Sequence, residues 1–230
     1  MIKYVKFKRK FLKAGVLCPC DIIAKIIRTG GSASMKTNRL EQQMAFVLEV
    51  DQLKKVERQT LIVDGSRREN SAEHSWHIAL MALLLAEHVD HREQLDLLKV
   101  VKMLLVHDII EIDAGDVFAY DDDDEREERE EKAAQRLFGL LPRDQAEELY
   151  ILWREFEERQ TPEARYAASL DRLLPLVQNY LSGGYTWVKY HIPEEKVRKR
   201  NQVISDSSQV LWQYAQSIID QAKGKGYFEK

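Results

Sequence analysis

The stretch LLVHDIIEIDAGD, residues 104–116, begins as the apolar run of a buried helix and then becomes ionisable. His107 and Asp108 follow one another, and Glu111 and Asp116 come within the next few residues. Burying such groups costs several kcal/mol each unless a partner compensates for the lost water. The stretch therefore indicates a buried site at which something stabilises these side chains.

The chain around this stretch is patterned for helices. Its 230 residues include only 5 prolines and 10 glycines, and long tracts are rich in the helix formers Leu, Ala, Glu, Lys and Arg. Apolar residues recur at helical spacing through most of the chain. We therefore predict an all-α single domain of about six to eight helices. The expected helices span about 35–57, 72–89, 94–110, 143–159, 163–181 and 203–222, with others after the acidic run at 121–124 and from Pro193.

The segments between these helices carry turn and capping signals. Residues 58–70, RQTLIVDGSRREN, are expected to form a loop because they contain an Asp-Gly turn signal. Ser71 is expected to cap the helix that follows, and Thr161-Pro162 supplies a cap and first-turn pair further on. Residues 185–193 are expected to form a short connection.

The overall composition argues against several classes of protein. The net charge of −3 gives no reason to expect binding to nucleic acid or to an anionic membrane. No apolar run reaches the roughly 18–20 residues of a membrane span. Cys18 and Cys20 are too close together for an ordinary disulfide, which favours a reducing, cytoplasmic location.

The two ends of the chain differ from its middle. We assign residues 35–222 to the domain and residues 223–230 to a C-terminal tail. Residues 1–34 form a basic extension with no acid before Asp21. This extension has three interpretations: a targeting peptide, a basic arm, or upstream sequence before a translation start at Met35. The codons of its Gly-Gly pair can encode a ribosome-binding sequence, which favours the third interpretation over a functional arm.

Four side chains along the predicted helices suit a metal site. His74 lies near the start of one helix, His107 and Asp108 near the end of the next, and Asp171 inside an apolar stretch of a later one. Two imidazoles and two carboxylates form a mixed nitrogen and oxygen set suited to Zn, Mn, Co or Fe. Adjacent helical residues point about 100° apart. His107 and Asp108 can therefore share one metal only where the helix approaches it end-on or is distorted.

Glu111 and Asp116 extend this set. Glu111 is four residues after His107 and three after Asp108, so on a helix it lies on the same face one turn later. A carboxylate at that place can hold or deprotonate a water whose pKa a metal has lowered. Asp116 follows Gly115 beyond the helix end, where a loop can approach a substrate.

Three ordered segments give this set a family resemblance. They are RRENSAEHS (67–75), HDIIEIDAGD (107–116) and SLDRLLPLVQNYLSGG (169–184). Together they resemble the HD-domain metal-dependent phosphohydrolases, in particular the 5′-deoxynucleotidase branch, over roughly residues 38–215. The resemblance implies a single HD-domain helical bundle that hydrolyses a nucleotide phosphomonoester. The implied substrate is a small-molecule (deoxy)nucleoside 5′-monophosphate, which yields nucleoside and phosphate.

The resemblance also implies a role for each residue of the site. Four ligands would hold one divalent metal ion (Mn, Co, Mg, Zn or Fe). One acidic residue would position the attacking water, and a second acidic residue would contact the sugar or help to hold the reacting groups. Basic residues before the first ligand would grip the phosphate. In that order, these residues are His74, His107, Asp108 and Asp171 for the metal, Glu111 for the water, Asp116 for the sugar, and Arg67 and Arg58 for the phosphate.

The match departs from the family pattern at one place, and other functions stay open. Deoxynucleotidases of this branch carry an Arg-Trp pair ahead of the first motif, whereas this chain has Arg58-Gln59-Thr60. The alternatives are a hydrolase of a larger nucleotide, meaning a triphosphate, an alarmone or a cyclic dinucleotide, and a non-catalytic metal-bound module that senses a nucleotide. Relatives are often homodimers, and the helix at 203–222 could supply such an interface.

Overall fold

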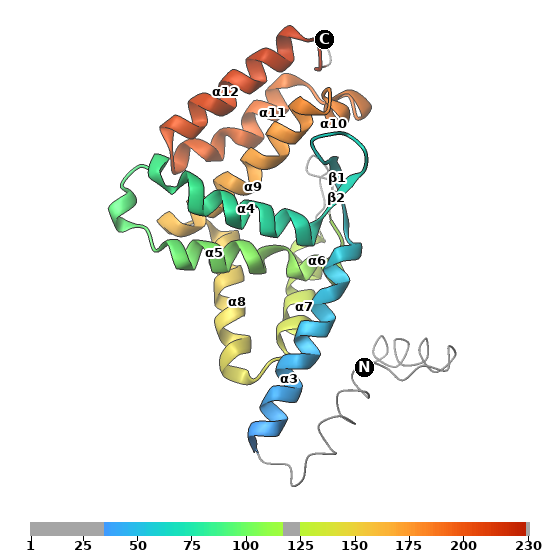
Figure 1. The fold of residues 1–230 in the computed structure, drawn as a ribbon, viewed down its shortest axis with the longest axis vertical. Helices are drawn as coiled ribbons and strands as arrows, with labels where there is room; N and C mark the ends of the chain where they lie inside the picture. The colour runs from blue at the N-terminus through green and yellow to red at the C-terminus, as the bar shows by residue number, and fades with distance from the viewer. Residues whose placement is uncertain (1–34, 117–124, 229–230) are drawn as a thin grey trace, which may run out of the picture.

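The computed structural model describes residues 35–116 and 125–228, and it is built almost entirely from helices (Figure 1). The predicted all-α class and helical bundle are confirmed. The interpretations of residues 1–34 and of the acidic run at 121–124 lie outside the described residues. No helix within the described ranges is long and apolar enough to cross a membrane.

The helices follow one another with short connections. The α-helices are α3 (Met35–Val50), α4 (Ser71–Leu85), α5 (Leu97–Val106), α6 (Glu111–Ala114), α7 (Arg126–Phe138), α8 (Arg143–Glu158), α9 (Pro162–Leu181), α10 (Tyr185–Lys189), α11 (Glu194–Asn201) and α12 (Gln209–Gly224). The 3₁₀ turns are η1 (Asp51–Lys55), η2 (Ala86–His88), η3 (Arg92–Gln94), η4 (His107–Ile110) and η5 (Gln202–Asp206). Figure 1 shows α4 and α5 crossing the middle of the molecule, with α3, α7 and α8 on one side and α9, α11 and α12 on the other.

The segment at 58–70 is a β-hairpin, so the expected loop was wrong. Strand β1 (Glu57–Leu61) pairs antiparallel with β2 (Arg68–Asn70), and the predicted Asp-Gly turn joins them. Gly65 adopts φ 71° in this turn, a left-handed value that glycine reaches without steric cost. The strands are short and mostly polar, so the sequence lacks the alternation that marks a strand. The hairpin carries Arg58, Gln59 and Thr60 toward α9 and α10.

Two further local predictions were wrong, and one was right. Residues 185–189 form α10, because buried Trp187 anchors a helical turn to the core. The cap of α4 is Asn70 rather than Ser71, since the Asn70 side chain accepts the backbone N–H of Glu73 and the Glu73 carboxylate accepts that of Asn70. Thr161 caps α9 as predicted.

Two hydrophobic clusters meet at residues 103–110. One cluster joins α4, α5, α9, α11 and α12, and it includes Met103 and Leu104. The other joins α3, α7 and α8, and it includes Val106, Ile109 and Ile110. The turn after α5 therefore has apolar neighbours in both clusters, and it holds His107 and Asp108 between them.

Candidate active site

Capping of α4 positions the first candidate ligand. The reciprocal Asn70–Glu73 cap fixes the first turn of α4, and His74 follows immediately with a fully buried side chain. Ile78 lies one turn later and packs in the core. The imidazole of His74 is therefore held at the helix entrance by a cap on one side and by core packing on the other.

A distortion of the next helix brings His107 and Asp108 together. Helix α5 ends at Val106, whose φ of −105° departs from the helical value, and the chain continues as the 3₁₀ turn η4. The predicted condition for sharing one metal, a distorted helix, is met at this point. Both side chains are buried, and Nε2 of His107 lies 3.0 Å from Oδ1 of Asp108.

The third element of the centre is α9, which supplies Asp171. Its Oδ1 lies 3.0 Å from Nε2 of His74 and 3.7 Å from Nε2 of His107. Pro175 follows four residues later and has no N–H to donate to the Asp171 carbonyl, so α9 lacks one helical hydrogen bond at this turn. The four predicted ligands thus converge from α4, η4 and α9.

Hydrogen bonds fix the orientation of both imidazoles. Nδ1 of His74 lies 3.0 Å from Oε2 of Glu69, and Nδ1 of His107 lies 2.9 Å from the Leu104 carbonyl oxygen. An ionised carboxylate and a carbonyl only accept hydrogen bonds, so each neutral ring carries its proton on Nδ1. Each Nε2 therefore presents a lone pair to the centre.

These donors fit a divalent cation. One ligand atom from each of His74, His107 and Asp108 lies within 4.8 Å of the others. Nε2 of His107 is buried and makes no hydrogen bond to any residue in the two described ranges. Nε2 of His74 faces an oxygen of Asp171 at 3.0 Å, and two electron-pair acceptors at that distance attract one another only through a cation or a proton. The anchored Nδ1 atoms match the support that metal-binding histidines usually have.

The centre is strongly acidic, and Arg58 offsets part of that charge. Its Nη1 donates to Oδ2 of Asp108 at 2.7 Å and lies 4.0 Å from Oε1 of Glu111. Although burial opposes the shift, His107 and Arg58 lower the pKa of Asp108 to about 2. Burial also opposes the charged form of His107, but Asp108 and Asp171 raise the pKa of His107 to about 10. The carboxylates thus favour a positive charge at the centre, which a bound cation can supply in place of a proton on Nε2 of His107.

Glu111 lies at the edge of this centre, at the start of α6. Its Oε2 accepts a 2.6 Å hydrogen bond from the Ser71 hydroxyl, whereas Oε1 does not accept this bond. Burial and the nearby Asp108 raise the pKa of Glu111 well above its ordinary value. A carboxylate with a raised pKa is better suited to accept a proton near neutral pH.

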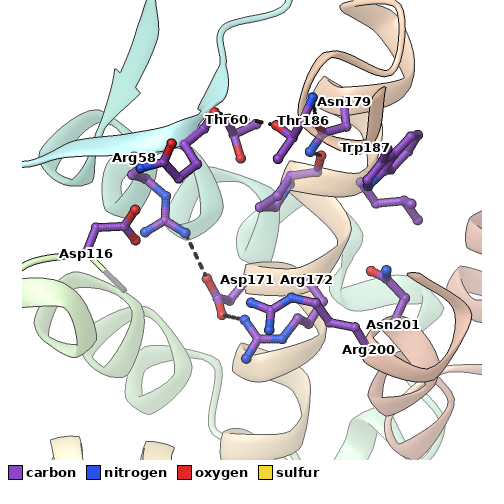
Figure 2. Close-up of a pocket in the computed structure, with 13 residues that line it drawn as sticks. Arg58, Thr60, Asp116, Asp171, Arg172, Asn179, Thr186, Trp187, Arg200 and Asn201 are labelled. Atoms are coloured by element: carbon purple, nitrogen blue, oxygen red, sulfur yellow. Dashed lines mark hydrogen bonds and ion pairs between the residues drawn. The ribbon is translucent and has the colours of Figure 1, made fainter. Parts of the chain in front are cut away.

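A polar pocket adjoins the centre (Figure 2). Its empty space, including the part open to solvent, is about 590 Å³. Figure 2 shows Arg58 and Asp116 on one side of it, Asp171 and Arg172 in the middle and Trp187 on the far side. The other lining residues are Gln59, Thr60, Pro175, Leu176, Asn179, Thr186, Arg200 and Asn201.

The structure separates the two arginines that the sequence assigned to phosphate. Arg58 is nearly buried among the carboxylates of the centre. The side chain of Arg67 is 55% exposed and forms an ion pair with Glu73 at the start of α4. Arg67 is not among the residues that line the pocket.

One face of α9 lines this pocket and was not predicted from the sequence. Arg172, Pro175, Leu176 and Asn179 are spaced i, i+3, i+4 and i+7, which places them on one side of a helix. Arg172 also donates to Oδ2 of Asp171. The periodicity of this stripe, with a polar residue at each end, was the signal that could have identified it.

A family model for the HD domain matches residues 50–212. The chain therefore belongs to the HD-domain family, and the predicted family resemblance is confirmed.

Individual relatives agree with this assignment. The chain is 31% identical to the Homo sapiens protein named 5′-deoxynucleotidase HDDC2 over 150 residues, which cover 64% of this chain and 71% of the human protein. The Bos taurus protein of the same name is 32% identical over 149 residues, covering 64% and 70%. A solved structure described as a predicted metal-dependent phosphohydrolase from Magnetospirillum magnetotacticum MS-1 is 50% identical, with a TM-score of 0.83 that covers 86% of this chain and 100% of that one.

Proposed function

We propose that this protein is a metal-dependent phosphohydrolase that converts a nucleoside 5′-monophosphate to nucleoside and phosphate. The observation that carries the proposal is the convergence of two imidazole lone pairs and two carboxylates beside a polar pocket. The names of the human and bacterial relatives support the same reaction class. A divalent metal bound by His74, His107, Asp108 and Asp171 would polarise the phosphoryl group and lower the pKa of a water molecule.

Glu111 is the proposed base for the attacking water. Its Oε2 is occupied by the Ser71 hydroxyl, so the proton would pass to Oε1. Oε1 lies 4.0 Å from Nη1 of Arg58, and the positive charge of that arginine favours the ionised carboxylate that the base requires. Ser71 thus fixes the direction of the base, and Arg58 supports the charged state of Glu111.

Arg172 is the proposed partner of the substrate phosphate. It lines the pocket directly beside Asp171, and its guanidinium can bind phosphate oxygens in a bidentate way. Arg58, which the sequence assigned to this role, forms an ion pair with Asp108 and so balances part of the negative charge of the centre. Asp116 lines the same pocket on the opposite side and would face the nucleoside.

The proposal is tested by measuring phosphate release from ribonucleoside and deoxynucleoside 5′-monophosphates with Mg, Mn, Co or Zn. We expect release that requires metal, and a loss of at least about a hundredfold in Glu111→Gln, because a positioned base contributes roughly that much. Asp108→Ala should lose bound metal as well as activity. Full activity in Glu111→Gln would reject Glu111 as the base, and metal-independent release would reject the metal centre.

A larger nucleotide substrate is a second candidate, and one observation favours it. Arg172 on α9 and Arg200 near the end of α11 line the same pocket, so a second anionic group has cations within reach. Nucleoside triphosphates and alarmones therefore belong in the substrate panel. Higher kcat/KM for these compounds than for every monophosphate would replace the first candidate by the second.

We also propose that the protein pairs with a second copy of itself. Trp76, Leu80, Leu83 and Leu84 are exposed on one face of α4, and Val210 and Tyr214 are exposed on α12. Clustered apolar side chains of this kind often mark an interface. Light scattering should give the mass of a dimer, and Leu83→Glu should shift it toward the monomer if α4 forms the interface.

A further inference from the structure

The chain that follows α12 packs against the wall of the pocket. Gly226 adopts φ 73°, a left-handed value, and the N–H of Tyr227 donates to the Ala222 carbonyl oxygen at 3.1 Å. This arrangement ends the helix and turns the chain away from its axis. Tyr227 and Phe228 are partly buried, and they pack against the hydrophobic cluster that includes Trp187 of α10.

Phe228 contacts the pocket wall through Trp187. The centroids of the two rings lie 5.1 Å apart with an angle of 47° between their planes, a separation at which aromatic rings attract one another. Trp187 is 2% exposed, and Figure 2 shows it on the side of the pocket far from Arg58. The indole therefore contacts both the pocket and Phe228.

Tyr227 packs against a position of the chain that has no side chain. Gly184 directly precedes α10 with φ 73°, and a Cβ atom added to it would lie 2.7 Å from Cβ and Cγ of Tyr227. This distance is far below van der Waals contact, so Tyr227 can approach only because residue 184 is glycine. Gly183 has a similar φ of 75°, but a Cβ atom there meets nothing within 4 Å. The close approach is therefore specific to Gly184.

The end of α9 also contacts this segment. The rings of Tyr180 and Tyr227 lie 6.4 Å apart, and Nζ of Lys225 lies 4.4 Å from the Tyr180 ring centroid. The Tyr180 hydroxyl donates to Oε1 of Gln221 on α12 at 2.9 Å. These contacts hold residues 225–228 at the junction of α9 and α10.

Helix α10 in turn joins two other parts of the pocket. The N–H of Thr186 donates to Oδ1 of Asn179 at 3.2 Å, and its Oγ1 donates to the Gln59 carbonyl oxygen at 3.4 Å. Both Thr186 and Asn179 line the pocket. A displacement of α10 would therefore change the wall formed by α9, α10 and β1.

We propose that Tyr227 and Phe228 are positioning residues of the pocket, which hold α10 in place and thereby set the affinity for the substrate. This inference rests on the proposed function, because it takes the pocket as the nucleotide site. Neither side chain is among the described residues that line the pocket, so both act through Trp187 and Thr186. The metal ligands and Glu111 belong to α4, η4, α6 and α9, so the chemical step should not depend on this contact.

Two variants disturb the contact in different ways. Phe228→Ala deletes the ring that packs on Trp187, and Gly184→Ala adds the Cβ atom that displaces Tyr227. In both variants we expect KM for nucleoside 5′-monophosphates to rise about tenfold, roughly the effect of one aromatic contact on an equilibrium, while kcat stays within about twofold of the wild-type value. A general folding defect would instead reduce the fraction of active enzyme and therefore lower the apparent kcat.

Gly183→Ala is the matched control for Gly184→Ala. It places alanine in the same left-handed region, but its Cβ atom meets no neighbour, so KM should stay near the wild-type value. Phe228→Tyr keeps an aromatic ring and should retain most of the affinity. Hydrogen exchange of the amides of residues 185–190 gives a readout that needs no substrate. It should be faster in Phe228→Ala and Gly184→Ala than in Gly183→Ala.

The outcomes separate this inference from the proposed function. A wild-type KM in both Phe228→Ala and Gly184→Ala overturns the positioning role and leaves the phosphohydrolase standing. An equal rise of KM in Gly183→Ala and Gly184→Ala also overturns it, because backbone strain and not the contact with Tyr227 would be the cause. Absence of phosphate release by the wild-type protein rejects the proposed reaction. In that case, faster exchange of the α10 amides in Phe228→Ala and Gly184→Ala supports the positioning of α10, and unchanged exchange overturns it.

Discussion

Glu69 and His74 form a buried hydrogen bond, with Oε2 of Glu69 3.0 Å from Nδ1 of His74. The other oxygen of Glu69 accepts from Nε2 of Gln178 at 2.7 Å, so the carboxylate acts as an acceptor on both sides. An amide at this position can accept from only one of the two partners and must present N–H to the other. The orientation of the first candidate metal ligand therefore depends on a carboxylate.

Glu69→Gln should weaken metal binding without removing a ligand. Loss of such a supporting partner typically lowers metal affinity about 10- to 100-fold. We expect activity to fall at limiting metal and to recover when metal is in excess, and metal titration by calorimetry measures the change directly. Glu73→Gln, on the first turn of the same helix but paired with exposed Arg67, is the control and should bind metal normally. Equal affinities in the two variants would show that Glu69 does not orient His74.

Arg172→Ala should weaken substrate binding, whereas Arg67→Ala should leave the kinetics nearly unchanged. Arg172 lines the pocket beside Asp171, and Arg67 is largely exposed and paired with Glu73. Loss of a charged hydrogen bond costs about 2 kcal/mol, which corresponds to a rise in KM of roughly thirtyfold. Arg172→Lys keeps the charge but not the bidentate geometry, so it should rescue only part of the affinity. The opposite pattern, with Arg67→Ala raising KM, would restore the assignment made from the sequence.

The side chains that converge at the centre could be predicted from the sequence, but their hydrogen bonds could not. His74, His107, Asp108 and Asp171 fall in three segments whose order and residue types carry the information. The protonated nitrogen of each imidazole depends on Glu69 and on the Leu104 carbonyl, which reach the rings through the folded backbone. Sequence spacing reports which residues can lie together, whereas the direction of a proton depends on atoms placed by the fold.

The pocket was harder to predict because its walls are set by tertiary contacts. Strand β1 is short and polar, and its position depends partly on the contact between Thr186 and the Gln59 carbonyl, 127 positions apart in the sequence. The lining face of α9 was not predicted, because leucines dominate that stretch. Arg67 was chosen for its nearness to the first motif, but the cap of α4 places Glu73 within its reach. In each of these cases a contact with a distant residue, or a helix cap, overrode the local sequence pattern.

Asn70→Ala should destabilise the fold through the cap of α4. The Asn70 side chain accepts the Glu73 N–H at 2.9 Å, and loss of such a cap typically costs about 1 kcal/mol of unfolding free energy. Chemical denaturation measures this change. Ser71→Ala, at the position first expected to be the cap, should leave the cap intact and instead lower kcat through the lost hydrogen bond to Glu111. A greater loss of stability in Ser71→Ala than in Asn70→Ala would contradict the capping geometry.

Acid should weaken the attachment of α3 to α8 through one ion pair. Arg39 donates from Nη1 and Nη2 to the two carboxylate oxygens of Asp144, at 2.7 and 2.8 Å. These hydrogen bonds lower the pKa of Asp144 to about 2, below the value of about 3.9 expected in the unfolded chain. A lowered pKa in the folded state means that the pair stabilises the fold above about pH 4 and that this contribution is lost as the pH falls through about 2.

Asp144→Asn should therefore remove a small part of the acid dependence of stability. Denaturation curves measured between pH 6 and pH 2, a window set by the two pKa values, should fall less steeply in the variant than in the wild-type protein below about pH 4. The pair is exposed to solvent, so added salt should reduce the difference. Asp206→Asn, an exposed carboxylate outside this ion pair, serves as the control. The bidentate pair joins α3 to α8. Equal slopes in Asp144→Asn and wild type would therefore mean that the apolar contacts of Phe46 with the second cluster hold α3, and that the ion pair does not.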